Sequence, residues 1–471
     1  MNDPTEDRPG SDDWPDDDAT PGWSRPEDGI RDFLRQAGLP ISDDASLEEM
    51  LGQLAHRMAE QLKRRADVGG DDTPVTWRAA KEAARQQIAS LGPDPVPDGR
   101  LTRQIADAAH LVDLWLDDRT IFPQLTLLPV AWSRQQWIEQ TMPTWQTMIE
   151  PVISTIAQGL YDAMGARLAE PGQIPELAEL SAVLQPVLRQ AADGMFGTRL
   201  GRELGRIATD VVTATDVGFP LTRQAQVVVL PTNLAAAAAG LGLPELDVLH
   251  YHSVREAARQ RLFKEVAWIG PQLIALVQHY AREIRIDPDA LSIAIERAVP
   301  PEVTLESVSQ FEVDINTAIF DPGKTEEQIA ILDRLETLVA LVEGWVDHVT
   351  SHAIAAWVPS AAALAETVRR RRAAGGPAAE VFATLLGLTI EPKRLREAQA
   401  LWDKLLAEKG VAGRDETWNH PDWMPTTADL TNPAAYVERL GRPVEDDPFD
   451  AEWRRLLERE QGRGEAEGPA A

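Results

Sequence analysis

The residues with the most specific spacing lie between Arg255 and Arg259, where the chain reads Arg-Glu-Ala-Ala-Arg. In a His-Glu-x-x-His helix, two histidines four residues apart bind a zinc ion, and the glutamate between them activates a water molecule. This chain keeps the glutamate, Glu256, and has arginine at both histidine positions. Arginine offers no lone pair to a metal and stays protonated at any relevant pH. We therefore expect no metal in this frame.

Two pairs among the eight histidines have spacings that could serve a metal. His348 and His352 are four residues apart, but on an ideal helix they lie roughly 140° and 180° from Glu343. His250 and His252 precede the arginine frame, on a segment that need not be helical. Histidines on a solvated face are the commoner case, so a metal role at either pair is the lesser alternative.

Two further patterns have a structural and a functional interpretation. Gly197, Gly201 and Gly205 recur at every fourth residue, which allows two helix backbones to approach closely. The four arginines of 369–372 could hold phosphates, but a Gly-Gly-Pro sequence follows soon after them. Cations at a helix C-terminus complement the helix dipole, so we favour a helix end over a phosphate site.

The elements that must position these residues are mostly helical. Apolar residues recur at three- and four-residue spacing in the segments 106–118, 137–160 and 331–349. The β-branched segment Gln224–Leu230 is the exception and reads as a short strand. The sequence predicts a mainly α fold with at most a small β element.

Composition restricts the partners and the compartment. The chain of 471 residues carries 46 basic and 75 acidic side chains, for a net charge of −29. That charge repels nucleic acid and anionic lipid, so we expect neither nucleic acid nor a membrane as a partner. There is no cysteine, and the acidic start of the chain lacks the apolar core of a signal peptide. We expect a cytoplasmic protein.

The ends of the chain differ in composition from its middle. Residues 1–28 hold ten acidic and two basic side chains, and a segment of this kind is expected to be disordered. The tail from 446 to 471 is similar. Between them we expect an N-terminal helical region over 29–125, a core over 126–415 and an extension over 416–445.

Several segments, in chain order, resemble the zincin-like metallopeptidase type 2 family of actinobacteria. They include HLVDLWLDDRTIFP, GTRLGRELG, DVGFPL, VVVLPTNL, LHYHSVREAARQRLFKEVAWIGPQL, LVEGWVDHV and GRDETWNHPDWMPTTADL. The resemblance extends from about residue 30 to about residue 435, and it implies a multi-helical zincin-like fold. Family members are described as zinc-dependent metalloproteases, as "putative hydrolases", or as proteins associated with coenzyme F420 biosynthesis.

The resemblance also assigns positions to the site. It matches Arg255 and Arg259 to the two zinc histidines, Glu256 to the general base and Glu343, in Glu343-Gly344, to the third ligand. Because the family's ligands point inward, we expect both arginines to pair with Glu343; the alternative is that they face solvent.

These residues predict a protein without peptidase chemistry. We expect no cofactor, an idle Glu256, and a role in binding or as a scaffold for an unknown protein or peptide partner. The alternative is an active zinc-dependent metallopeptidase or hydrolase, with zinc held by His250, His252 or His348 together with Glu256 and Glu343.

Overall fold

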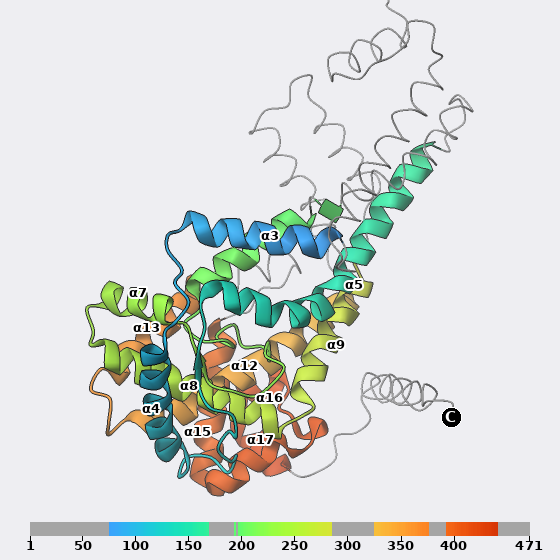
Figure 1. The fold of residues 1–471 in the computed structure, drawn as a ribbon. Coiled ribbons are helices and arrows are strands. Elements are labelled where there is room, and N and C mark those ends of the chain that lie inside the picture. The colour runs from blue at the N-terminus through green and yellow to red at the C-terminus, as the bar shows by residue number, and fades with distance from the viewer. Residues whose placement is uncertain (1–74, 169–192, 195, 285–324, 376–391, 441–471) are drawn as a thin grey trace, which may run out of the picture. The chain divides into compact units, whose positions relative to one another are not determined.

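Figure 1 shows the fold in a computed structural model, which describes residues 75–168, 193–194, 196–284, 325–375 and 392–440. Contacts divide the chain into two units, one of residues 1–71 with 174–187 and one of 72–173 with 188–471. All the described residues belong to the second unit. The two segments predicted to be disordered, 1–28 and 446–471, lie outside the described residues.

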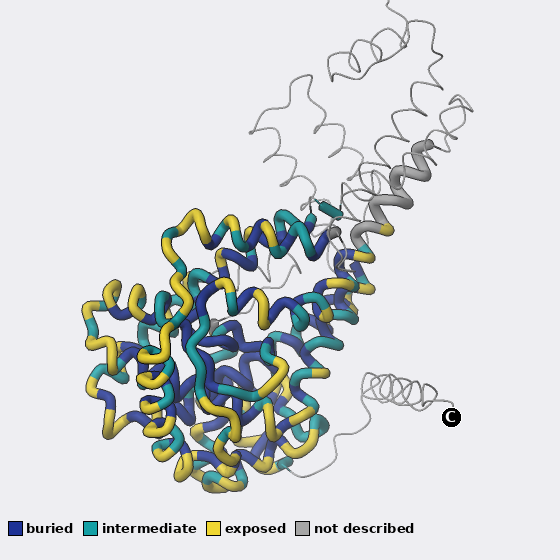
Figure 2. Tube along the Cα trace, viewed as in Figure 1, coloured by how far each residue is buried: buried dark blue, intermediate teal, exposed yellow. Residues whose placement is uncertain are grey.

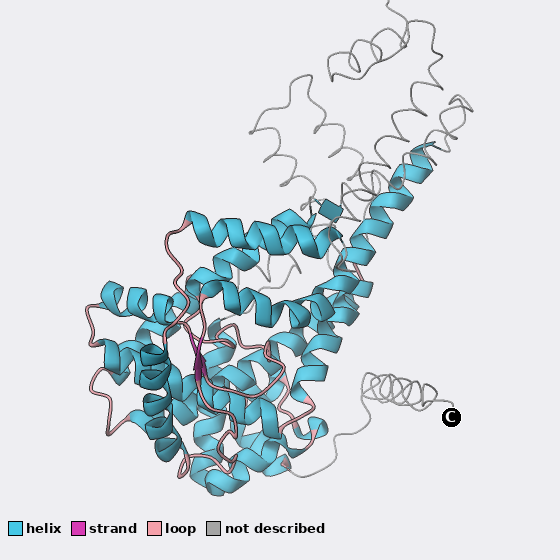
Figure 3. Ribbon diagram, in the orientation of Figure 1, coloured by secondary structure: helices cyan, strands magenta, loops and turns pink. Residues whose placement is uncertain are grey.

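Helices form nearly all of the regular structure in the described part of the chain (Figure 3). The longer helices are α3 (Val75–Ser90), α4 (Gly99–Leu116), α5 (Arg134–Leu168), α7 (Pro231–Leu241), α8 (Glu245–Glu265), α9 (Ile269–Arg282), α12 (Glu326–Ile354), α13 (Ala361–Ala373) and α15 (Pro392–Asp415). Shorter turns follow: η1 (Glu416–Asn419), η2 (Pro421–Trp423), α16 (Thr427–Thr431) and α17 (Pro433–Arg439). The predicted mainly α fold is confirmed.

The β structure of the described residues is one small parallel pair. Strand β1 (Val130–Ala131) pairs with β2 (Val228–Val229), and the latter lies inside the predicted strand segment. An isolated antiparallel bridge joins Thr213 to Val229. The strand stops early because Pro231 starts α7 two residues later, as proline favours the first turn of a helix.

Local signals fix where the central helices begin. Thr325 and Gln328 form a capping box at the start of α12, each side chain bonding the other's backbone N–H. Helix α8 starts after Pro244, with Glu245 and Asp247 in its first turn, where carboxylates interact favourably with the helix dipole. The segment that carries His250 and His252 is therefore helical, which settles a point that the sequence left open.

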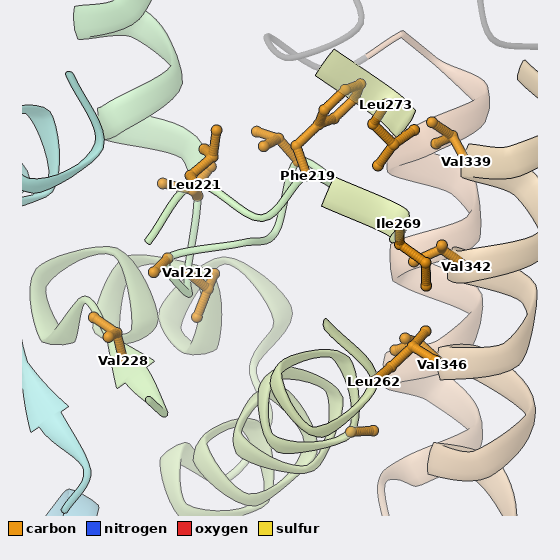
Figure 4. Packing of buried hydrophobic residues seen from close by; sticks show 14 of the residues in the cluster. Val212, Phe219, Leu221, Val228, Leu262, Ile269, Leu273, Val339, Val342 and Val346 are labelled. Carbon is orange, nitrogen blue, oxygen red and sulfur yellow. The ribbon is translucent and has the colours of Figure 1, made fainter. Parts of the chain in front are cut away.

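Helices α8 and α12 lie at the centre of the described unit, where Figure 2 shows the darkest, most buried tube. Helix α8 packs against α4, α7, α12 and α13, and α12 packs against α9 and α15. Figure 4 shows apolar side chains of these helices in contact: Leu262 lies beside Val346, and Ile269 beside Val342. This packing holds α8 against α12 along the stretch that carries the arginine frame.

The fourth-residue glycines lie on the helical stretch 196–210 and face α3. A methyl group at Gly197 would meet the carbonyl oxygen of Thr76 at 2.1 Å, and one at Gly201 would meet that of Ala80 at 2.1 Å. Only glycine permits this approach of two backbones. The close packing predicted from their spacing is confirmed.

The flanking regions also contact this core. Helix α4, in the predicted N-terminal region, packs on α8, and α3 packs on α5. At the other end, η1, α16 and α17 pack on α15. The division of the chain at residues 125 and 415 stays a prediction.

Candidate functional site

Three helices bring charged side chains to one buried place. Arg255, Glu256 and Arg259 come from α8, Glu343 and Asp347 from α12, and Arg372 from the last turn of α13. Residues four apart share a helix face, so Arg255 and Arg259 lie opposite Glu343 and Asp347. We refer to these six residues as the arginine–carboxylate cluster.

Glu343 is the centre of the cluster. Arg259 binds it with two parallel bonds, from Nε to Oε1 at 2.6 Å and from Nη2 to Oε2 at 3.0 Å. Arg255 donates from Nη2 to Oε2 at 2.9 Å and from Nη1 to Asp347. Both arginines are fully buried, and Glu343 is 4% exposed. The expected pairing of the two arginines with Glu343 is present, and the solvent-facing alternative is wrong.

Arg372 closes the outer side of the cluster. It donates to Oε2 of Glu343 and, at 3.1 Å, to Oδ2 of Asp347. Its side chain is 20% exposed and that of Asp347 is 17% exposed, so these two groups connect the buried charges to the surface. Glu343 thus receives hydrogen bonds from three guanidinium groups.

Glu256 is held separately, on the inner side. Thr215 Oγ1 donates to its Oε2 at 2.7 Å, and Gln260 Nε2 donates to its Oε1 at 2.9 Å. Arg259 reaches its Oε2 only at 3.4 Å. Thr215 belongs to the loop that follows the helical stretch 196–210. Gly218 lies on that loop with φ +84°, a conformation that favours glycine, and it lies beside Glu343.

The pKa values of the two buried glutamates are shifted in opposite directions. Burial raises the pKa of Glu256, and Arg259, Gln260 and Thr215 do not offset it. Burial also acts to raise the pKa of Glu343, but Arg259, Arg372 and Arg255 outweigh it, and the pKa falls below its usual value. The charge of Glu343 is compensated inside the protein, whereas that of Glu256 is compensated only in part.

A second charged group lies beside the cluster. Asp216 is partly buried, which acts to raise its pKa, but nearby His252, Arg371 and Arg259 hold that pKa below its usual range. Its carboxylate also accepts a bond from the backbone N–H of Val212. Burial lowers the pKa of His252 to about 4, so its imidazole is neutral at pH 7. Arg371 pairs with Asp210.

The run of four arginines has two kinds of member. The run lies at the C-terminal end of α13, where cations complement the helix dipole, and the predicted helix end is present. Arg369 and Arg370 are exposed and pair with Glu366. Arg372 instead turns to Glu343 and Asp347 of the cluster, and Arg371 pairs with the partly buried Asp210. The helix-end interpretation is therefore incomplete.

The other two candidate histidines, His250 and His348, have partners other than Glu256 and Glu343. His250 is only partly buried and stands edge-on to Trp115. His348 bonds Asp403 of α15, as expected from its angle to Glu343 on α12. Among the described residues, the groups of three that could converge on an ion are His348, His352, Asp403 and His279, Glu283, Glu327. Neither group contains Glu256 or Glu343, so the alternative ligand set is not brought together.

The cluster's chemistry can be tested against a zinc ion. Zinc takes lone pairs from nitrogen, sulfur or oxygen. The guanidinium groups of Arg255 and Arg259 offer none, and both oxygens of Glu343 already accept arginine bonds. The residues present do not fit zinc. What they can do is hold three helices together by charge-assisted hydrogen bonds.

Sequence reasoning missed four of the residues around this site. Asp347 had a signal, since it follows Glu343 by four residues on the same helix. Arg372 belongs to the run of four arginines already noted, but nothing in the sequence distinguishes it from its three neighbours, and Thr215 and Gln260 had no signal at all. Their roles depend on how the loop at Thr215 and helix α13 lie against α8.

Comparisons with known proteins agree with this architecture. The sequence profile of the zincin-like metallopeptidase family matches residues 75–437. A solved structure from Chloroflexus aurantiacus, described as "a putative hydrolase with a novel fold", is similar with a TM-score of 0.51 and 18% sequence identity. The similarity covers 78% of this chain and 99% of that one, and at this identity it shows a shared fold alone.

Two further findings are negative. No curated protein matches the chain. In the part of the chain that the structure describes, no helix has the length and apolar character needed to cross a membrane.

Proposed function

Because the chain belongs to the zincin-like metallopeptidase family, we propose that it is a member without peptidase activity that acts as a binding or scaffold protein. In this proposal Arg255 and Arg259 stand at the positions of the two zinc histidines, Glu343 at the third ligand and Glu256 at the general base. The proposal rests on the resemblance for these positions and on the arginine–carboxylate cluster for their chemistry.

The observation that carries the proposal is the pair of parallel hydrogen bonds from Arg259 to Glu343. Glu343 receives parallel bonds at 2.6 and 3.0 Å and further bonds from Arg255 and Arg372, so both of its oxygens and its charge are already engaged by guanidinium groups. Charge supports the same conclusion, since two guanidinium groups already supply the two positive charges that a zinc ion would bring. A zinc ion added to them would meet repulsion.

Glu256 also fits a role without catalysis. A general base in a metallopeptidase acts on a water molecule that the metal activates. Here both oxygens of Glu256 accept bonds from protein side chains, Thr215 and Gln260. These bonds support a structural role, in which Glu256 ties the loop at Thr215 to α8.

A peptidase assay tests the proposal. The untagged protein, treated with chelator and then supplied with zinc or left without it, is incubated with casein and with a library of fluorogenic peptides. We expect no hydrolysis that depends on zinc. Glu256→Gln serves as the control, because cleavage by a contaminant is unaffected by this change. Hydrolysis that zinc supports and Glu256→Gln abolishes would establish the active alternative instead.

The class of partner follows from the net charge of −29. We propose a protein or peptide partner in the cytoplasm, because a strongly anionic chain is repelled by nucleic acid and by anionic lipid. Gel-shift assays with DNA and RNA, and sedimentation with anionic vesicles, should show no binding at low salt. Binding in either assay that disappears at high salt would contradict this choice of partner.

A further inference from the structure

A second group of possible metal ligands lies between α12 and α15, and its two histidines are five and nine residues beyond Glu343. His348 and His352 are four residues apart on α12, and Asp403 faces them from α15. One ligand atom from each residue lies within 4.8 Å of the other two. Two imidazoles and a carboxylate are the donors that zinc and similar divalent ions take, and three such ligands leave a further position open.

The histidine rings are already oriented by hydrogen bonds. Nδ1 of His352 donates to the backbone carbonyl of His348 at 2.8 Å, which leaves the lone pair of its Nε2 for a metal. Histidines that bind metals are commonly held by a bond of this kind to a backbone carbonyl. The two imidazole rings lie side by side, with centroids 4.5 Å apart.

The distance between the donor atoms of His348 and Asp403 needs only a small adjustment to suit a metal ion. Nδ1 of His348 lies 2.6 Å from Oδ1 of Asp403, whereas two ligands of a tetrahedral zinc ion lie roughly 3.3 Å apart. The side chain of Asp403 is 54% exposed, so it is free to move outward. Binding through Nδ1 places the ring proton of His348 on Nε2, which is buried with no hydrogen-bond partner among the described residues, so the metal bond must outweigh the cost of that unsatisfied N–H.

The two helices form a firm base for these ligands. A methyl group at Gly344 would lie 2.7 Å from Cβ of Ala398, so α12 and α15 approach closely one turn before His348. Trp402, next to Asp403, is buried and donates to the carbonyl of Leu341. The backbone positions of the three ligands are therefore fixed by packing that does not depend on a metal.

We propose that His348, His352 and Asp403 form a surface site for a divalent transition-metal ion of the zinc class. Bound there, the ion joins α12 to α15 from outside. The site is independent of the arginine–carboxylate cluster, because His348 and Glu343 point to different sides of α12, toward α15 and toward α8. It is also independent of whether the chain has peptidase activity.

Titration with cobalt and zinc tests the proposal. The untagged, chelator-treated full chain is titrated with cobalt chloride, whose visible absorption reports the coordinating atoms, and then with zinc chloride in competition. We expect one equivalent to bind in the micromolar range. The changes His352→Ala and Asp403→Asn should each weaken binding about tenfold or more, because each removes one of three ligands. Both residues are exposed, so both variants should fold.

His420→Ala is the matched control. His420 is an exposed histidine that also lies beside a carboxylate, Asp422, at 3.3 Å, but it belongs to none of the possible ligand groups among the described residues. Its replacement should leave metal binding unchanged. An absence of binding, or binding that His352→Ala and Asp403→Asn leave intact, would overturn the proposal. In that case the bond of His348 to Asp403 is a structural contact only.

Discussion

At the scale of single residues, the arginine–carboxylate cluster shows how the cost of a buried charge depends on its partners. Arg259 is fully buried and satisfies Glu343 through two bonds, whereas Arg370 is exposed and pairs with a single surface glutamate. Removing one partner of a buried pair leaves a charge without compensation and costs on the order of 3–5 kcal/mol.

We therefore expect Arg259→Ala to lower the free energy of unfolding by on the order of 3 kcal/mol. Arg370→Ala, which removes an arginine from the same protein at an exposed position, should change it very little. Urea denaturation followed by tryptophan fluorescence measures both. Equal, small losses for the two variants would mean that Arg259 does not hold the helices together.

The opposite pKa shifts of Glu256 and Glu343 give a second prediction. Stabilisation by Glu343, whose pKa is lowered from 4.5, is complete above that value and is lost as the pH falls through the lower folded value. Glu343→Gln should therefore destabilise the protein strongly at pH 7, and the difference from wild type should narrow at about pH 3. Urea denaturation at both pH values measures the difference.

Glu256→Gln is the matched variant for that experiment. Burial raises the pKa of Glu256, so its charge contributes no comparable stabilisation at neutral pH, and an amide oxygen can still accept the bond from Thr215. Its loss of stability at pH 7 should be much smaller than that of Glu343→Gln. A larger loss for Glu256→Gln would mean that the charge of Glu256 is the better compensated of the two.

The sequence could predict part of this site. The spacing of Arg255 and Arg259 and the resemblance to a family together identified Glu343 as their partner, and the structure places it there. Arg372 could not be found in this way. It stands in a run of four identical residues, and only the position of α13 against α8 and α12 decides which two of the four turn inward.

At the scale of elements, small residues decide how closely helices approach. Gly201 lies so near α3 that a methyl group would meet the carbonyl oxygen of Ala80 at 2.1 Å. Gly240, on α7, has nothing within 4 Å of the same position and an ordinary helical backbone. The same substitution should therefore have opposite effects at the two glycines.

Gly201→Ala should destabilise the protein, because the helices must separate to admit the methyl group. Gly240→Ala should stabilise it by about 0.5–1 kcal/mol, since alanine restricts the unfolded chain and favours a helix. Thermal denaturation of the two variants provides the measurement. A stabilising Gly201→Ala would show that the helical stretch 196–210 and α3 do not pack as closely as described.

Elements differed in how well the sequence predicted them. The helical period of 331–349 identified α12, because apolar residues face both α8 and α15 along much of its length. Helix α8 is buried on nearly every side yet carries Arg255, Glu256, Arg259 and Arg261. A period of apolar residues does not reveal such a helix, since its buried polar groups are compensated by residues far away in the chain.

At the scale of the whole molecule, the chain matches its family although arginines stand at the positions proposed for the zinc histidines. The chain matches the family's sequence profile over residues 75–437, while the cluster joins α8, α12 and α13 through side chains. Two guanidinium groups and one zinc ion carry the same total charge. Exchanging one for the other therefore keeps the buried charge of Glu343 and Asp347 compensated, provided that suitable ligands replace the arginines.

The double variant Arg255→His with Arg259→His should accordingly bind zinc between α8 and Glu343. It is best made in a His352→Ala background, so that the surface site proposed above does not contribute. We expect about one equivalent of zinc after dialysis and a zinc-dependent rise in melting temperature, neither of which the His352→Ala parent should show.

Arg372 is the next residue to replace. Its bond to Oε2 of Glu343 does not involve the two arginines of α8 and should remain in the double variant. Adding Arg372→Gln to the double variant should strengthen zinc binding, since it frees that oxygen and removes a positive charge. Arg370→Gln is the control and should have no effect. Failure of both the double and the triple variant to take up zinc would mean that these helices do not hold Arg255, Arg259 and Glu343 at the positions of metal ligands.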